Sequence, residues 1–180
     1  MENLEEKQKS RELIYDGVIL KAVKDTVILP NGKEAVREVC LHPGAVAILA
    51  VTDEGKILME RQFRYPHQRV FYEIPAGKLD SKNEDILEAA KRELREETGA
   101  IAGKMTYLGH ISPSPAILDE RIALFLAEEL SFGERDLDED EFLNVEAADP
   151  KLLTEMVMKG EIEDAKTQIA ILKYNMLKQN

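Results

Sequence analysis

Cysteine, long apolar runs and an excess of positive charge are all scarce in this sequence. Its one cysteine, Cys40, excludes an internal disulfide framework and a multi-cysteine zinc site. Residues 1–6 lack the apolar segment of a secretory signal. The longest apolar run, residues 45–51, is too short to span a bilayer. We therefore expect a cytoplasmic protein.

Negative charge dominates, with 35 Asp and Glu against 24 Lys and Arg and a net charge of −11. Without a basic stripe, the chain is not expected to bind nucleic acid or an anionic membrane. The 180 residues, 44% of them hydrophobic, fit one domain or one domain with a small appendage. The same acidity would repel an anionic substrate unless cations intervene.

Short β segments with tight turns are predicted over residues 12–42, where Asn31-Gly32 is a strong hairpin signal. From Gly44 a continuously apolar run indicates a strand buried on both faces. Further strands are expected at 57–62, 70–74, 105–111, 122–129 and 142–145, and helices at 84–97, 150–159 and 164–177.

Strands and helices interleave without a regular βαβ alternation. This favours an α/β (α+β) fold with a mixed sheet sandwiched by helices, preceded by a small antiparallel β layer. We expect the layer to comprise residues 1–42 and the main domain residues 43–180.

The helix expected from residue 84 has recognisable ends. Ser81 and Glu84 have the spacing of a capping box, which predicts that the helix begins there. Gly99 suits the left-handed position that follows a helix.

Three carboxylates gather in the last turns of this helix. Glu93 and Glu97 are four residues apart, so they project from one face, with Glu96 beside them. Like charges at this spacing repel, and the helix dipole disfavours anions near its carboxyl end. Clustered oxygen ligands suit a hard cation such as Mg²⁺. The alternative reading is a solvated helix face.

This segment resembles the Nudix box, G-x5-E-x7-R-E-U-x-E-E-x-G-U, in which U is a bulky apolar residue. The matching residues are Glu84, Arg92, Glu93, Leu94, Glu96, Glu97 and Gly99. Two departures occur: six residues rather than five separate Gly77 from Glu84, and Ala100 is smaller than the usual final residue.

Other segments resemble the ADP-ribose pyrophosphatases within that family: residues 62–66, 73–77, 114–115 and 160–167. Ala116 departs from the Pro-Gly that this subfamily often has at positions 115–116. The resemblance implies hydrolysis of ADP-ribose to AMP and ribose 5-phosphate, with Mg²⁺ as cofactor and Mn²⁺ as a substitute.

The resemblance also implies metal binding by the backbone carbonyl of Ala76 and the carboxylates of Glu93 and Glu97. Glu96 would be a further ligand or hydrogen-bond acceptor in catalysis, and Arg92 would orient these carboxylates.

The acidic run at residues 134–141 occupies the place of a loop that supplies the catalytic base in the resembling enzymes. Glu139 maps to that base and Glu141 to a further metal ligand. A solvated acidic loop is the alternative.

Arg37 and Arg64 are candidates for gripping the diphosphate or the terminal ribose, because a guanidinium presents a planar fork of donors. For either arginine a surface salt bridge is the alternative. Glu73 is expected to face the substrate or else to occupy an exposed strand position. The three histidines lack metal-ligand spacing and receive no role.

The resemblance further implies a homodimer formed through residues 12–42, which are too few to bury their own core, with Arg37 serving the partner's site. Two alternatives to ADP-ribose hydrolysis stay open. One is action on another nucleoside diphosphate sugar, such as GDP-mannose, and the other is a non-catalytic ADP-ribose-binding module, against which the intact set of glutamates argues.

Overall fold

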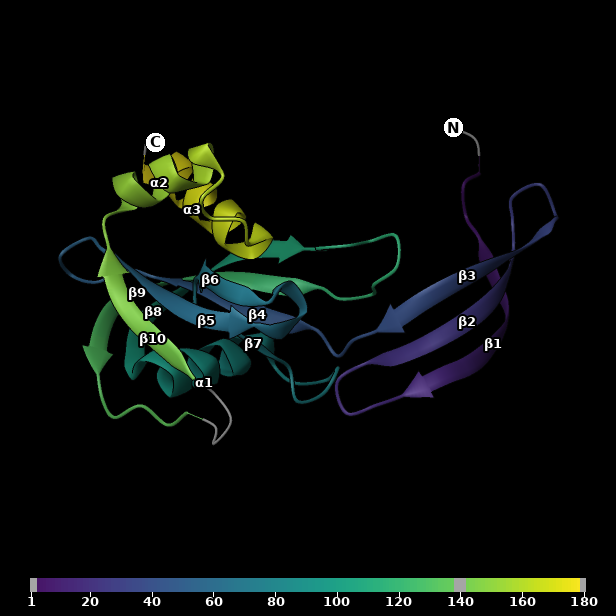
Figure 1. Ribbon diagram of the computed structural model, residues 1–180, viewed down its shortest axis with the longest axis horizontal. Coiled ribbons are helices and arrows are strands. Elements are labelled where there is room, and N and C mark those ends of the chain that lie inside the picture. The colour runs from purple at the N-terminus through teal and green to yellow at the C-terminus, as the bar shows by residue number, and fades with distance from the viewer. Residues whose placement is uncertain (1–2, 138–141, 179–180) are drawn as a thin grey trace. The chain divides into compact units, whose positions relative to one another are not determined.

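The computed structural model describes residues 3–137 and 142–178, in two units. The first unit is Met1–Pro43 with Ser112–Glu120, and the second is Gly44–Ile111 with Arg121–Asn180 (Figure 1). Of the predicted site residues, Glu139 and Glu141 lie outside the described residues.

The first unit is a three-stranded antiparallel sheet of β1 (Lys7–Asp16), β2 (Lys21–Ile28) and β3 (Glu34–Leu41), in that order. The predicted Asn-Gly hairpin joins β2 to β3, and Gly32 has a φ of 80°, which glycine adopts at little cost. The segment 112–120 joins the unit because the Cys40 N–H donates to the Ile117 carbonyl (2.7 Å). Local sequence patterns do not reveal this long-range connection.

The second unit contains two sheets. A mixed four-stranded sheet has the order β7-β4-β9-β8, in which β4 and β9 are parallel, and a three-stranded sheet has the order β10-β5-β6. The strand bounds are β4 (Ala45–Ala50), β5 (Ile57–Arg64), β6 (Arg69–Glu73), β7 (Ala76–Lys78), β8 (Ala100–Ile111), β9 (Ile122–Phe132) and β10 (Leu143–Ala148). A short 3₁₀ turn, η1 (Tyr65–His67), joins β5 to β6.

Helices cover both faces of these sheets, with α1 (Ile86–Thr98) on one side and α2 (Pro150–Lys159) and α3 (Ala165–Lys178) on the other (Figure 1). The buried strand β4 shows why. Val46 and Ile48 pack in the cluster that contains α1, whereas Ala47 and Leu49 pack in the cluster that contains α2 and α3. Alternate side chains of one apolar strand thus meet opposite helix layers, as the predicted sandwich requires.

None of the helices in the described part of the chain is both long and apolar enough to cross a membrane.

The predicted start of α1 is wrong. Asp85, not Ser81, is the N-cap, and its side chain accepts hydrogen bonds from the N–H groups of Leu87 (2.9 Å) and Glu88 (3.1 Å). Glu84 lies outside the helix because its carboxylate accepts instead from the Asp80 N–H (2.6 Å) and from Arg92 (3.2 Å). The predicted end at Gly99 is confirmed, with a φ of 73°.

Candidate active site on the acidic helix

Glu93 and Glu97 point from α1 toward β7 and are almost completely buried, at 9% and 3% exposure. A Cβ atom at Gly77 would lie 1.9 Å from Cδ of Glu93, so the glutamate fills space that only glycine leaves open. The Ala76 N–H donates to Oε2 of Glu97 (2.9 Å). The turn before β7 and the last turns of α1 therefore form one cradle around two carboxylates.

Arg92 is the hub of the surrounding charges. Its Nη1 donates to Glu93 (2.8 Å) and Glu96 (3.1 Å), and its Nη2 donates to Glu84 (3.2 Å). Burial opposes the charge of Arg92, but Glu93 and the other carboxylates raise its pKa overall. One guanidinium thus orients three carboxylates, which is the geometry expected of the positioning role assigned to Arg92.

The donor chemistry of this cradle fits Mg²⁺. Buried carboxylate oxygens are ligands that a hard cation prefers, and Glu93 and Glu97 present them beside the backbone of Ala76. In residues 3–137 and 142–178, however, no three acidic, histidine or cysteine side chains converge as a ready metal site. A complete ligand set would need further oxygens, such as the Ala76 carbonyl and Glu141.

The segment after β9 is anchored to the carboxyl end of α1. The Gly133 N–H donates to the Gly99 carbonyl (2.8 Å), Nε of Arg135 donates to the Glu97 carbonyl (2.7 Å), and the Asp136 N–H donates to the Glu96 carbonyl (3.2 Å). These bonds satisfy carbonyls that a helix end leaves open. Residues 133–136, where the predicted base loop begins after β9, are therefore held against the helix that carries the carboxylates.

Arg64 and Glu73 form a bidentate pair between β5 and β6. Nε of Arg64 donates to Oε1 of Glu73 (2.8 Å), and Nη2 donates to Oε2 (2.9 Å). Glu73 is only 3% exposed, so an exposed strand position for it is wrong. Burial raises the pKa of Glu73, but its bonds to Arg64 and the charge of Lys166 outweigh this and lower it. The hydrogen bond to Glu73 is the main cause of the raised pKa of Arg64, and the charges of Asp164 and Glu97 add to it in smaller measure.

Lys166 is a residue that the sequence analysis missed. Its Nζ forms an ion pair with Glu73 and another with Asp164 (3.0 Å). It lies within the 160–167 segment already noted for its resemblance, but a lysine in the first turn of a helix is usually exposed to solvent. Its burial, at 9% exposure, becomes visible only in the tertiary structure.

Arg37 belongs to the first unit, whereas the box, Arg64 and Glu73 belong to the second. Within its unit Arg37 lies on β3, and its Nε donates to Glu6 (2.9 Å). In the single chain Arg37 thus forms the surface salt bridge given as the alternative. The role of Arg37 in a partner's site stays a prediction.

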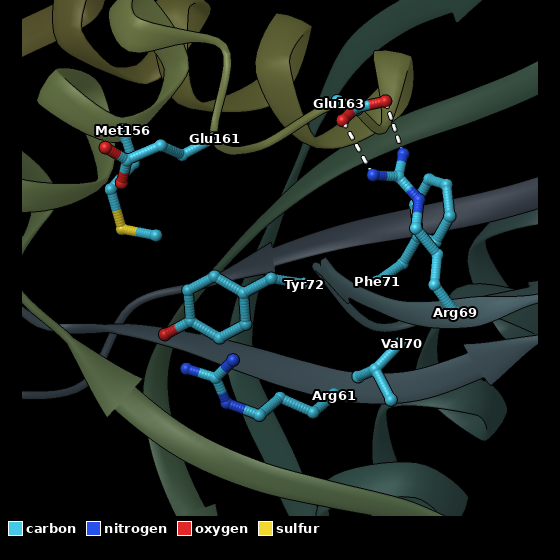
Figure 2. A pocket seen from close by; sticks show the side chains of 8 residues that line it. All are labelled: Arg61, Arg69, Val70, Phe71, Tyr72, Met156, Glu161 and Glu163. Atoms are coloured by element: carbon cyan, nitrogen blue, oxygen red, sulfur yellow. Dashed lines mark hydrogen bonds and ion pairs between the residues drawn. The ribbon is translucent and has the colours of Figure 1, made fainter.

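A separate hollow of about 190 Å³ lies against β6 (Figure 2). Figure 2 shows the Arg61 guanidinium under the Tyr72 ring, 4.4 Å from its centroid, and Arg69 bound to Glu163. Arg61 also pairs with Glu146 (3.0 Å). The two glutamates that line this hollow, Glu161 and Glu163, are exposed, whereas Glu93 and Glu97 of the cradle are buried, so the hollow is a poorer candidate for a cation and its diphosphate.

Comparisons with known proteins find similarity over most of the chain. The NUDIX domain model matches residues 41–168. The chain is 49% identical to the ADP-ribose pyrophosphatase of Bacillus subtilis, over 99% of this chain and 97% of that protein. It is 43% identical to the methanol dehydrogenase activator of Bacillus methanolicus, over 93% of this chain and 91% of that protein.

A crystal structure of an ADP compounds hydrolase superposes with a TM-score of 0.85 at 19% identity, covering 99% of this chain and 97% of the other. At that identity the likeness concerns the fold alone. It confirms the predicted sandwich together with its antiparallel layer.

Proposed function

Because the chain belongs to the Nudix family, we propose that it hydrolyses the pyrophosphate bond of ADP-ribose to AMP and ribose 5-phosphate. The observation that carries the substrate is the similarity, over nearly the whole length, to a protein named ADP-ribose pyrophosphatase. The buried glutamate pair on α1 supports the chemistry, since it supplies the oxygen ligands that such a reaction requires.

The residues that would hold Mg²⁺, or Mn²⁺ in its place, are Glu93, Glu97, the Ala76 carbonyl and Glu141, with Glu96 at the edge of the set. When bound, the cation would neutralise the diphosphate and make water more acidic. It would also remove the conflict between an acidic protein and an anionic substrate.

The chain's own residues would bind the substrate and move the proton. Arg64 would grip the diphosphate, and Arg92 would hold Glu93 and Glu96 in place. Glu139 would accept a proton from the attacking water while the new phosphorus–oxygen bond forms and the bridging bond breaks. The proton ends on the phosphate products.

The proposal includes a homodimer in which the first unit forms the contact and Arg37 serves the partner's site. The turn between β1 and β2 supports it, because Val18, Ile19 and Leu20 are 97%, 67% and 47% exposed. Three consecutive large apolar side chains in one turn are best explained by a surface that another chain covers. A cytoplasmic location, consistent with a lone cysteine, completes the proposal.

A chromatographic substrate panel tests the proposed function. Wild-type protein with Mg²⁺ is given ADP-ribose, GDP-mannose and other nucleotide sugars, and AMP and the other products are quantified. The proposal expects the highest kcat/KM for ADP-ribose. A preference for GDP-mannose would assign the chemistry to another sugar nucleotide, and binding of ADP-ribose without turnover of any compound would indicate a non-catalytic module.

A further inference from the structure

Three contacts join the start of α3 to β6. They involve the residues just before α3 and its first turn on one side, and β6 with Ile74 on the other. Glu163 binds Arg69 at the start of β6, as Figure 2 shows. Lys166 binds Glu73 at the end of β6. The hydroxyl of Thr167 accepts from the N–H of Ile74 (2.9 Å), one residue further on. This end of α3 thus fixes the backbone that leads into Ala76 and Gly77.

Asp164 ties these contacts together. Its carboxylate accepts from Nζ of Lys166 (3.0 Å) and from the N–H of Thr167 (2.9 Å), so it both caps the helix and orients the lysine. Lys166 is 9% exposed and Thr167 is fully buried. Buried polar groups with several partners have one arrangement rather than many, which makes them suited to positioning.

We propose that Lys166 is a positioning residue, which acts through Glu73 to hold Arg64 in the orientation that grips the substrate diphosphate. This inference rests on the proposed function and adds to it a residue on the terminal helix.

The geometry explains how Lys166 would act. Oε2 of Glu73 accepts from both Nη2 of Arg64 and Nζ of Lys166, so the lysine fixes the carboxylate to which the arginine fork is bound. Nε and Nη2 of Arg64 donate to Glu73, so the third guanidinium nitrogen, Nη1, points away from the Glu73 carboxylate. The Arg64 side chain is 39% exposed, whereas that of Glu73 is 3% exposed. Of these linked side chains, Arg64 is therefore the one that solvent and substrate can reach.

A second carboxylate nearby adds a reason for this support. Glu60 lies directly opposite Glu73 in the β5–β6 register, and both are 3% exposed. When both are ionised, carboxylates in such cross-strand positions repel each other. Without Lys166, we expect Glu73 to shift and to carry Arg64 with it, because a bidentate pair moves as a unit.

A double-mutant cycle on the full chain tests the proposal. KM and kcat for ADP-ribose are measured at saturating Mg²⁺ for Lys166→Met, Glu73→Gln and the double variant. Lys166→Arg serves as the conservative rescue, and Lys173→Met, on the same helix but bound to the Leu108 carbonyl, serves as the matched control. Thermal unfolding is recorded for every variant.

The proposal expects Lys166→Met to raise KM about 10-fold, the lower end of the loss typical of supporting residues. It expects kcat to stay within about 2-fold, because substrate binding rather than the chemical step depends on Arg64. The double variant should have the KM of Glu73→Gln, because a residue that acts only through Glu73 adds nothing once Glu73 is changed. Lys166→Arg should restore most of the affinity, and Lys173→Met should match the wild type. If Lys166→Met does not fold, Lys166→Gln replaces it in the cycle.

An unchanged KM with a lowered melting temperature would overturn the proposal in favour of a purely structural role, as would multiplicative losses in the double variant. Failure of the proposed function shows instead in the wild type. If the wild type prefers GDP-mannose, the same cycle is run with that substrate, whose diphosphate needs the same grip. A wild type that turns over no nucleotide sugar overturns both proposals.

Discussion

Gly77 and Glu93 show how a single missing side chain shapes the candidate site. The carboxylate of Glu93 fills the space that a side chain at position 77 would need, because a Cβ built there would lie only 1.9 Å from Cδ of Glu93. The box motif identifies both residues from the sequence, but their contact depends on the β7 turn folding back against α1. A motif thus predicts which residues matter without showing which of them touch.

Gly77→Ala should therefore move Glu93 and lower kcat by about 100-fold, since displacement of a catalytic group by 1 Å can have that effect. The measurement is steady-state hydrolysis of ADP-ribose at several Mg²⁺ concentrations. Gly55→Ala is the control for kcat: nothing lies within 4 Å of a Cβ there, and the strain from its φ of 77°, in the turn between β4 and β5, would lower stability rather than kcat. Equal activity of the two variants would show that the cradle tolerates a side chain.

The proposed base gives a second prediction. Glu139→Gln should lower kcat by about 10²–10⁴-fold and leave KM nearly unchanged, because a general base acts in the chemical step. Asp136→Asn and Asp138→Asn should have little effect. If Glu139→Gln is as active as these controls while Glu141→Gln is inactive, the two roles are exchanged. If all four variants are active, the base lies in the box, with Glu96 next in line.

At the scale of elements, Thr167 links α3 to the strand that enters the cradle. Thr167→Val keeps the shape but removes the hydroxyl that accepts from the buried N–H of Ile74 and donates to Asp164. The change should lower the free energy of unfolding by about 1–3 kcal/mol. Urea denaturation measures this change. Thr106→Val, an exposed threonine on β8, should change stability far less. Equal effects would show that the Thr167 bond adds nothing to stability.

Most elements could be predicted from local patterns, and the misses have physical reasons. The continuous apolar run of β4 and the Pro150-to-Gly160 boundaries of α2 are strong local signals, and the structure confirms them. The short strand β7 was not predicted, because three residues carry no periodicity and pair only through contact with β4. The helix start was misplaced because Asp85 and Ser81 both suit an N-cap, and the contacts that hold Glu84 outside the helix, from the Asp80 N–H and from Arg92, form only in the folded chain.

The residues of the candidate site also fall into a part that could be predicted from the sequence and a part that could not. Glu93, Glu96, Glu97 and Arg92 lie on one helix, so their spacing alone places them together. The Arg64–Glu73–Lys166 chain joins β5, β6 and α3, and its members are up to 102 positions apart in the sequence. No periodicity connects residues at that separation, which is why Lys166 received no role from the sequence.

At the scale of the whole molecule, the exposed apolar turn at Val18–Leu20 predicts self-association. Light scattering after gel filtration should give twice the mass of one chain. Val18→Asp combined with Ile19→Asp should yield monomers, because burying a charge in an apolar contact is strongly unfavourable. Asn31→Asp, in the polar turn of the neighbouring hairpin, should stay dimeric.

Enzymatic activity should depend on dimerisation, because Arg37 would serve the partner's site. The monomeric variant should bind ADP-ribose more weakly, and deletion of residues 1–42 should give an aggregated or inactive protein. A fully active, monomeric truncation would refute both the dimer and the role of Arg37.

The central claim is that the acidic turn of α1 is a cation-dependent hydrolytic centre, and Glu97→Gln tests it most directly. The measurement is the rate of AMP release from ADP-ribose at saturating Mg²⁺. The control is Glu88→Gln, which changes an exposed glutamate in the first turn of the same helix that forms an ion pair with Lys91 (2.8 Å). We predict that Glu97→Gln lowers kcat by about 100-fold or more with little loss of thermal stability, while Glu88→Gln keeps the wild-type rate. Near wild-type turnover by Glu97→Gln would contradict this claim and leave Glu97 a buried structural residue that accepts from the Ala76 N–H.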